Sequence, residues 1–525
     1  MKNLRLRDIE LGSSDAKHEL LNSAHEEENQ YLQRFVIPDN VIPEEFLDRK
    51  KFFIVGLKGT GKTALLRYLD IQVRLQDSAP HTSFILFKTD FSDDEKDRFG
   101  AASNAFMVNN TPEYSKEFDK YLKVWEWFFH RQIVRLAVED GLDLFEKSDE
   151  WKNYVACLTA VKESDKTSFF RNLIPKVKRG NVEVGAAFMG ASAKLGLELE
   201  WNNETSQIEF SRLLDEAKKW FSKLRPKSGK KLYIFVDELE IALTVSKQYK
   251  RDVELVRDLI LTVSHLNQQF AKLSIPIYIV TAVRGEVLTA VESTGSEINK
   301  HVFDFGLSLR WHQSGGNIKD HPLIKMINRR IQSSERMNGI PQSSDDDIWV
   351  KYFPISINTV PAMEYILSRT WHRPRDIVRL LKLAKTHYPN EHSFTHQAFD
   401  GTAKDYSTES WTEMSEELST IYSPNEIKGI KYILQGFESP FIFEDFKTTV
   451  QDKSEDYDEV ADLIKKHRPA KILHSLYDIG VIGNSGERVR FAHRGDDGLL
   501  IDLPMKVIDP LWKYLSIRPR KKCSN

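Results

Sequence analysis

Apolar residues gather in short continuous runs that are separated by segments with helical periodicity. Such runs lie at residues 52–55, 83–89, 232–236 and 276–283, and a further one lies at 302–311. A strand that is buried on both faces is expected to be continuously apolar, as the strands of parallel sheets are. Because the first two runs enclose a helical segment, they predict a βαβ unit and hence a parallel sheet. We therefore expect an α/β fold.

Residues 91–228 interrupt the predicted sheet. Helical patterns cover 114–138, 146–162 and 207–224, and alternation of apolar and polar residues predicts a β-hairpin within 177–201. The basic tip of this hairpin is either solvated or a contact for a partner or nucleic acid. The first helix carries four aromatic residues that indicate a packed core more than a base-stacking surface: Trp125, Trp127, Phe128 and Phe129.

A glycine-rich loop follows the first apolar run. Residues 56–63 read GLKGTGKT and lead into a helix, and glycine lets such a loop adopt positive φ and turn its N–H groups inward. The helix directs its positive end at bound phosphates. Lys62 then reaches the β- and γ-phosphates, while the Thr63 hydroxyl ligates Mg²⁺. We expect ATP and Mg²⁺ as ligands, with nucleotide contacts from Gly56, Leu57, Lys58, Gly59, Thr60, Gly61, Lys62, Thr63 and Ala64, and with positive φ at Gly56, Gly59 and Gly61.

An acidic pair ends the apolar run at 232–236, where Asp237 and Glu238 follow directly. The carboxyl ends of parallel strands meet at one edge of a sheet, so the pair is expected near the phosphate loop. Asp237 is suited to hold Mg²⁺ through its water shell. Glu238 is suited to orient or deprotonate an attacking water. The alternative interpretation of the pair is an acidic helix cap.

A second basic group lies far along the chain, where HRPRD opens a helix at about residue 374. Proline and aspartate suit the first turn of a helix. Arg375 at that turn lets a helical lid present a guanidinium to the triphosphate. The alternative is an ordinary helix start with Arg375 in a surface ion pair.

The C-terminal part shows the order of helices and hairpin that is typical of a winged helix. Helices are predicted at 425–435, 443–449 and 461–479, and a strand at 488–492. A DNA-binding winged helix needs basic residues for phosphate contacts, and the candidates are Lys465, Lys466, Arg468, Lys471, Arg488 and Arg490. Winged helices also dock proteins or sense nucleotides, so both interpretations stay open.

Composition narrows the class of protein. With 75 Lys and Arg against 77 Asp and Glu, the net charge is −2, so nucleic acid would need a local basic patch. Cys157 and Cys523 are too few for a disulfide framework or a Cys-based zinc site, and they fit a reducing compartment. No apolar run approaches the roughly 18–20 residues that span a bilayer, and the first residues lack an apolar signal core. We expect a cytoplasmic protein with no membrane partner.

Taken in order, GLKGTGKT, YIFVDELE, the strand at 277–283 and HRPRDIVRLL resemble the motifs of AAA+/STAND P-loop ATPases, most closely those of bacterial FunZ-like ATPases. The resemblance covers about residues 35–390, and the 91–228 segment departs from a minimal AAA+ core. It implies that Arg375 is the sensor-2 arginine and Thr281 is sensor 1, with Arg284 as the second candidate for that role. It also implies hydrolysis of ATP, with Lys62, Glu238, Thr281 and Arg375 as catalytic residues, and a homo-oligomer in which Arg310 is a candidate arginine finger.

Together these patterns predict a P-loop NTPase sheet with a helical and β-hairpin insertion, a helical lid and a C-terminal winged helix. The predicted boundaries are a loose N-terminal arm at 1–34, an ATPase core at 35–90 and 229–312, the insertion at 91–228, the lid at 313–400, and a linker with the winged helix at 401–525. The first functional hypothesis is an ATPase switch that couples nucleotide state to conformation, assembly, or binding of DNA or a partner effector protein. The FunZ-like resemblance adds bacterial defence as its setting. The alternative is a nucleotide-dependent DNA-binding or scaffold protein with little turnover.

Overall fold

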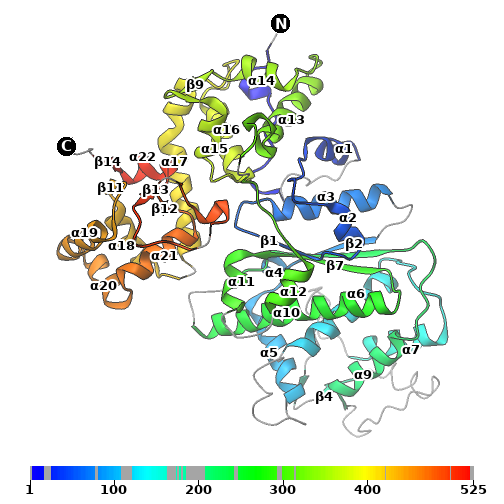
Figure 1. Ribbon diagram of the computed structural model, residues 1–525. Coiled ribbons are helices and arrows are strands. Elements are labelled where there is room, and N and C mark those ends of the chain that lie inside the picture. The colour runs from blue at the N-terminus through cyan, green and yellow to red at the C-terminus, as the bar shows by residue number, and fades with distance from the viewer. Residues whose placement is uncertain are drawn as a thin grey trace. The chain divides into compact units, whose positions relative to one another are not determined.

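The computed structural model of the chain divides into two compact units (Figure 1). The sheet unit comprises Ile42–Val55 and Leu69–Ser308, and the lid unit comprises Met1–Val41, Gly56–Tyr68 and Leu309–Asn525. The described residues are 3–16, 25–76, 81–107, 121–161, 173, 177–178, 181–184, 207–241, 246–292, 298–312, 315–419, 421–486, 488–496 and 498–520.

The sheet unit is built on a five-stranded parallel sheet with the strand order β2-β6-β7-β1-β8. The strands are β1 (Phe53–Gly56), β2 (His81–Leu86), β6 (Leu232–Asp237), β7 (Ile277–Arg284) and β8 (Gly306–Ser308). Every residue of β6 is buried, as its continuous apolar run predicts for a strand covered on both faces. The predicted α/β fold with a parallel sheet is confirmed.

Helices cover this sheet and share one hydrophobic core with it. They are α4 (Phe87–Asp90), α5 (Asp93–Met107), α6 (Leu122–Val138), α7 (Asp149–Thr159), α9 (Phe210–Phe221), α10 (Ser246–Lys272), α11 (Gly285–Glu292) and α12 (Ile298–Phe305). The short helix α2 (Pro43–Leu47) belongs to the same unit. The indole of Trp125 on α6 donates to Leu255 O of α10 at 2.9 Å. All four aromatic residues of α6 are buried, so the interpretation of this cluster as core is confirmed.

Two predicted strands are shorter than their apolar runs. β2 ends at Leu86 because the Asp90 carboxylate accepts the Leu86 N–H at 2.6 Å, which closes the turn of α4. Residues 302–305 belong to α12, and only 306–308 form β8. A Cβ at Gly306 would lie 2.1 Å from Val302 O, so this tight passage from helix to strand requires glycine.

A small antiparallel sheet lies within the segment predicted as an insertion. It consists of β3 (Val177–Lys178), β4 (Asn181–Glu183) and β5 (Gln207–Glu209). The predicted hairpin is confirmed for β3 and β4, and residues 185–206 lie outside the described part of the chain. The helix predicted from 207 is wrong at its start, because residues 207–209 pair with β4 before α9 begins.

The lid unit contains the N-terminal segment, the phosphate loop and a helical domain. Its helices up to the C-terminal part are α1 (His25–Arg34), α13 (Pro322–Met337), α14 (Asp345–Tyr352), α15 (Ala362–Ser368), α16 (Pro374–His387) and α17 (His396–Leu418), with a short hairpin of β9 (Ser356–Ile357) and β10 (Val360–Pro361). α3 (Lys62–Gln76) begins in this unit and continues into the sheet unit.

The N-terminal residues are packed, not loose as predicted. Leu4, Leu6, Ile9 and Leu11 are buried in one core with α13 and α16. The Leu6 N–H also donates to Glu391 O at 2.7 Å. The alternating charges of this segment suggested a solvated arm, although its four apolar residues pack in the core.

The C-terminal part has the helices and hairpin of a winged-helix order. Its elements are α18 (Pro424–Leu434), β11 (Glu438–Ser439), α19 (Phe443–Asp456), α20 (Asp458–Lys466), α21 (Pro469–Asp478), β12 (Ile482–Asn484), β13 (Met505–Val507), α22 (Trp512–Leu515) and β14 (Arg518–Pro519). The single helix predicted at 461–479 is wrong, since the chain is extended at His467 and Arg468 and α21 begins with Pro469. The strand predicted at 488–492 is also wrong: β12 pairs with β13, and Arg490 forms only an isolated bridge.

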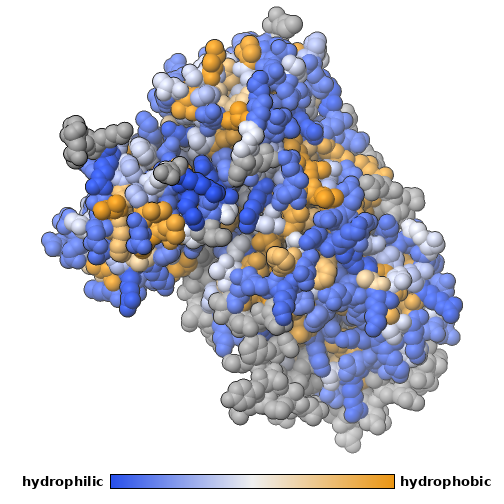
Figure 2. All heavy atoms as spheres, in the orientation of Figure 1, coloured by the Kyte–Doolittle hydropathy of each residue, from blue (hydrophilic) through white to orange (hydrophobic). Residues whose placement is uncertain are grey.

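Hydrophilic residues dominate the face of the molecule drawn in Figure 2, in keeping with 29% charged residues. Among the described residues, no helix is both long and apolar enough to cross a membrane.

Candidate nucleotide-binding site

The phosphate loop runs from the end of β1 to the start of α3. Gly59 and Gly61 adopt left-handed conformations, with φ of 79° and 90°, which glycine reaches without steric cost. The predicted positive φ is wrong for Gly56. Glycine is needed at Gly56 for space instead, because a Cβ there would lie 2.6 Å from the Thr60 hydroxyl.

The loop is closed around its own lysine. The Lys62 ammonium is buried and donates to Gly56 O at 2.8 Å and to Leu57 O at 2.9 Å. Thr60 braces the turn, since its hydroxyl also donates to Leu57 O, at 2.8 Å, and the Trp311 indole donates to Thr60 O at 2.8 Å. The ammonium therefore sits among loop carbonyls at the N-terminus of α3, where the helix dipole favours an anion.

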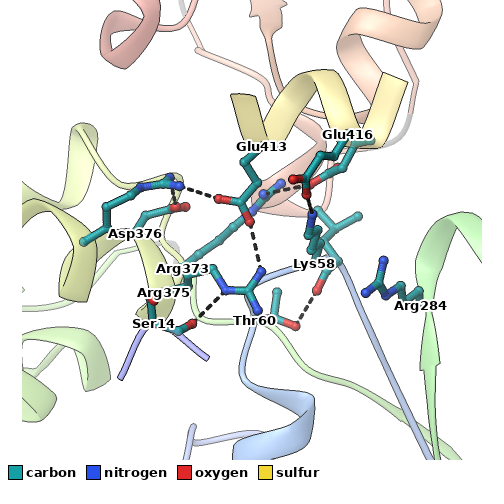
Figure 3. A network of polar contacts seen from close by, with 12 residues as sticks. Ser14, Lys58, Thr60, Arg284, Arg373, Arg375, Asp376, Glu413 and Glu416 are labelled. Atoms are coloured by element: carbon teal, nitrogen blue, oxygen red, sulfur yellow. Dashed lines mark hydrogen bonds and ion pairs between the residues drawn. The ribbon is translucent and has the colours of Figure 1, made fainter. Parts of the chain in front are cut away.

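Arg375 lies in the first turn of α16, next to this loop (Figure 3). Its backbone N–H donates to Gly59 O at 3.5 Å, and a Cβ at Gly59 would lie 3.4 Å from the Arg375 Cβ. Its guanidinium donates to Ser14 O at 2.9 Å and pairs with Glu413 of α17 at 3.0 Å. The structure thus brings Arg375 to the phosphate loop and also gives it an acidic partner.

The acidic pair lies in the sheet unit, at the carboxyl end of β6. The buried Asp237 is the last residue of the strand, and its carboxylate accepts the Glu238 N–H at 2.8 Å. Glu238 has a φ of 58°, a left-handed conformation that is uncommon for a side chain of this size. β1 and β6 belong to one parallel sheet, so the pair lies at the sheet edge where the phosphate loop departs from β1.

Thr89 is a site residue that the sequence reasoning missed. Its hydroxyl donates to the Glu238 carboxylate at 2.5 Å. Asp90 is a close neighbour, and burial chiefly, together with the charge of Glu238, raises the pKa of its carboxyl. The signal available in the sequence was a polar Thr-Asp pair after the β2 apolar run, at the same sheet edge as the acidic pair.

Thr281 and Arg284, the two sensing candidates, differ in their surroundings. Thr281 pairs with Val236, one residue before Asp237, and is fully buried. Its hydroxyl oxygen has no hydrogen-bond partner among the described residues. Arg284 instead pairs with Glu240 and lies 3.7 Å from Glu286. Of the two candidates, Thr281 is therefore the one whose side chain can still form a hydrogen bond with a ligand.

The candidate DNA contacts lie on or beside α20 and α21 and between β12 and β13. Three of them pair with acids of the same domain: Lys465 with Asp462 at 2.9 Å, Lys466 with Glu426 at 3.1 Å and Arg488 with Asp496 at 2.8 Å. Arg468 and Lys471 are exposed at the start of α21, and Arg490 lies at the wing beside Asn484.

A parallel sheet with a glycine-rich phosphate loop after β1 and an Asp-Glu pair after β6 defines a P-loop NTPase fold. Two family models match parts of the chain. Residues 19–248 match the ORC-CDC6-like family, and residues 321–415 match the FunZ-associated C-terminal helical domain. These matches confirm the resemblance to FunZ-like P-loop ATPases with a C-terminal helical domain that the motifs indicate. No curated protein matches the chain.

The first match spans the whole segment predicted as an insertion, and the second spans α13 to α16 and most of α17. The second match ends at residue 415, within α17, and includes Trp411 and Glu413.

Proposed function

We propose that the protein binds ATP with Mg²⁺, hydrolyses it, and uses nucleotide state to change the conformation of its lid and winged-helix domain. The observation that carries this proposal is the phosphate loop, with left-handed Gly59 and Gly61 leading into Lys62 at the first turn of α3. The ORC-CDC6-like match supports the ATPase class.

The bound triphosphate replaces the loop carbonyls as partner of the Lys62 ammonium. Two carbonyl oxygens at 2.8 and 2.9 Å hold the ammonium in the loop, and phosphate oxygens are stronger acceptors for a cation. The first N–H groups of α3 have no intrahelical acceptor and bind phosphate oxygens as well. Arg375 adds a guanidinium from α16.

The residues present fit Mg²⁺, which prefers oxygen ligands. The hydroxyl of Thr63 and the buried carboxylate of Asp237 are of this kind, and Asp237 is held in place by the Glu238 N–H. When bound, Mg²⁺ neutralises charge on the β- and γ-phosphates.

Glu238 acts as the general base that orients and deprotonates the attacking water. Its carboxylate is held by the Thr89 hydroxyl at 2.5 Å, which restricts its orientation. Thr281 donates its buried hydroxyl to the γ-phosphate or to the water, and this bond satisfies an otherwise unpaired group.

The turn that precedes α16 supports coupling to the winged helix. Within the lid unit, the Trp371 indole donates to Gly480 O at 2.9 Å and Arg369 donates to Asp509 O at 3.2 Å. Trp371 and His372 have φ of 45° and 49°, and such conformations cost on the order of 1–3 kcal/mol each. A strained turn that touches the winged helix and leads directly into Arg375 is suited to transmit a change at the phosphate loop.

Two variants test the proposal by calorimetric binding of ATP and by phosphate release. Lys62→Ala is expected to abolish nucleotide binding. Glu238→Gln is expected to bind ATP with unchanged affinity while turnover falls by about 100-fold or more, since general-base catalysis contributes 10²–10⁴-fold. Hydrolysis at the wild-type rate by Glu238→Gln contradicts the assignment of the base.

A nucleotide-dependent DNA-binding protein with little turnover is the second candidate function. Exposed Arg468 and Lys471 at the start of α21, the position of a recognition helix, favour it. The phosphate-release assay is therefore run with and without duplex DNA, beside a DNA-binding assay with and without ATP. ATP-dependent DNA binding without turnover in either condition selects this function over the ATPase switch.

A further inference from the structure

Three cations of the lid unit flank the phosphate loop. Lys58 belongs to the loop itself. Arg373 lies directly before α16, and Arg375 lies in its first turn. A Cβ at Gly59 would lie 3.4 Å from Arg375 and 3.6 Å from Arg373, so both arginine side chains pass directly beside the loop backbone. These are positions from which cations can reach phosphate oxygens.

Helix α17 supplies one carboxylate to each of these cations (Figure 3). The three glutamates that make these contacts, Glu413, Glu416 and Glu417, have the spacing i, i+3, i+4, which places them on one helix face. The Lys58 ammonium lies 2.7 Å from Glu416, the Arg375 guanidinium lies 3.0 Å from Glu413, and the Arg373 guanidinium lies 3.6 Å from Glu417. Each of the three cations beside the loop is therefore already paired with a carboxylate of α17.

Glu413 carries its charge at neutral pH. Burial acts to raise the pKa of Glu413, but the charges of Arg379, Arg375 and Arg373 outweigh it and hold the pKa well below its usual range. Glu416 is a solvated carboxylate with 65% of its side chain exposed.

We propose that α17 is an autoinhibitory element whose Glu413 and Glu416 compete with the triphosphate for Arg375 and Lys58. This inference rests on the proposed function, since it needs a nucleotide at the phosphate loop. Carboxylates and phosphates present the same kind of acceptor to ammonium and guanidinium groups, and one cation does not satisfy both fully. Bound nucleotide therefore takes Arg375 and Lys58 away from Glu413 and Glu416, while the rest of the α17 contact stays in place.

The exchange leaves no buried charge without a partner, which keeps its free-energy cost low. Glu413 also binds Arg379 at 2.5 Å through its other oxygen and keeps this pair when Arg375 turns to phosphate. Glu416 returns to solvent. Arg373 and Glu417 have only 2% and 8% of their side chains exposed, so this pair stays closed as the anchor of the contact.

Release of α17 reaches the C-terminal domain through shared packing. Trp411, Met414 and Leu418 of α17 are buried in the core of the winged-helix domain. The Tyr514 N–H also donates to the Ser407 hydroxyl at 2.9 Å. A shift of α17 about the retained Arg373–Glu417 pair therefore moves the winged helix with it.

The affinity for the non-hydrolysable analogue AMP-PNP with Mg²⁺ tests this proposal in four proteins. They are the wild type and the variants Glu416→Gln, Glu409→Gln and Lys62→Ala. Glu416→Gln removes an exposed ion pair, and such pairs contribute up to about 1 kcal/mol, so its Kd is expected to fall by roughly two- to fivefold. Glu409→Gln is the matched control, because it makes the same charge change at an exposed position of α17. Its Kd is expected to equal that of the wild type. Lys62→Ala is expected to abolish binding of AMP-PNP, which shows that the measured affinity depends on the phosphate loop.

A second measurement uses carbodiimide cross-linking, which joins an adjacent amine and carboxylate. The Lys58–Glu416 product is expected in the wild type and is expected to decrease several-fold when AMP-PNP saturates the protein. Equal Kd values for Glu416→Gln and wild type, or a cross-link unaffected by nucleotide, overturn the autoinhibitory contact while nucleotide binding stands. Absence of binding in all four proteins overturns both the proposed function and this inference.

Discussion

At the scale of single residues, the backbone of Glu238 decides what its side chain can do. Neighbouring residues on a strand point to opposite faces, which would direct Glu238 away from the side that Asp237 serves. The strand ends at Asp237, and Glu238 turns into the left-handed region with a φ of 58°. Conformations of this kind persist where surrounding contacts fix them, here the bonds to Asp237 and Thr89.

Thr281→Val tests the proposed sensing role at this scale. The substitution keeps the shape of the side chain and removes a buried hydroxyl that has no partner among the described residues. The free energy of unfolding is expected to stay equal or to rise by up to about 1 kcal/mol, because an unsatisfied polar group is lost. Turnover is expected to fall by about tenfold or more, since one bond to the γ-phosphate or water disappears.

Chemical denaturation and phosphate release measure the two effects separately. Ser83→Ala is a control in the neighbouring part of the sheet, because the Ser83 hydroxyl accepts from Gln132 at 3.0 Å and has no proposed catalytic part. A stable Thr281→Val protein with wild-type turnover contradicts the role of Thr281.

At the scale of elements, four histidines join the lid helices to the wing within the lid unit. His321 caps α13, His372 precedes α16, His493 lies in the wing, and His312 follows β8. The ring of His372 lies 4.9 Å from His312, 5.5 Å from His321 and 6.1 Å from His493. In the described part of the chain these rings form no group that could hold a metal ion. They form a packing cluster in which His321 is buried and the other three rings are partly buried.

This cluster predicts acid sensitivity. Burial lowers the pKa of all four rings, to about 4 for His321, and neighbouring histidines and Arg494 lower several of them further. The unfolded chain takes up these protons below about pH 6.5, whereas the folded rings stay neutral. Stability is therefore fully present above about pH 6.5 and declines as the pH falls below it.

His493→Gln removes one ring of the cluster. The free energy of unfolding is therefore expected to fall less steeply with decreasing pH in this variant than in the wild type. The free energy of unfolding is measured between pH 7.5 and 5.5. His474→Gln is the control, since it makes the same substitution at an exposed position of α21 outside the cluster. Equal slopes for His493→Gln and wild type contradict the assignment.

At the scale of the whole molecule, the chain alternates between the two units. Residues 56–68 and Arg375 belong to the lid unit, while Asp237, Glu238 and Thr281 belong to the sheet unit. The chain passes from one unit to the other after residues 41, 55, 68 and 308. The phosphate loop is thus joined to the sheet by its two flanking chain segments and packs with the lid.

The AAA+ resemblance predicts an assembly of several copies, in which Arg310 serves a neighbour. Glu238→Gln is expected to retain ATP, so mass photometry with and without ATP on this variant is expected to show a nucleotide-dependent oligomer. The double variant Lys62→Ala/Glu238→Gln is the control and is expected to remain unchanged by ATP. A constant monomer in both proteins speaks against an assembling switch.

Local patterns were sufficient for the sheet and for the chemical types at its edge. The apolar run of β6 predicts a strand buried on both faces, and glycine, lysine and threonine in the phosphate loop predict its conformation at Gly59 and Gly61. They were insufficient where an element ends, as at Leu86 and Gly306, because a carboxylate or a close backbone approach sets the boundary.

The sequence by itself determined the phosphate loop, the acidic pair and the arginine at the start of α16, because each is a short pattern whose chemistry depends on adjacent residues. Only the tertiary structure decided that α17 places Glu413 and Glu416 on Arg375 and Lys58, that Thr89 holds Glu238, and that four histidines meet. These contacts join side chains from 38 to 358 positions apart, as for Arg375–Glu413 and Lys58–Glu416. No local periodicity encodes them, since they arise when separate elements bury their apolar faces in common cores.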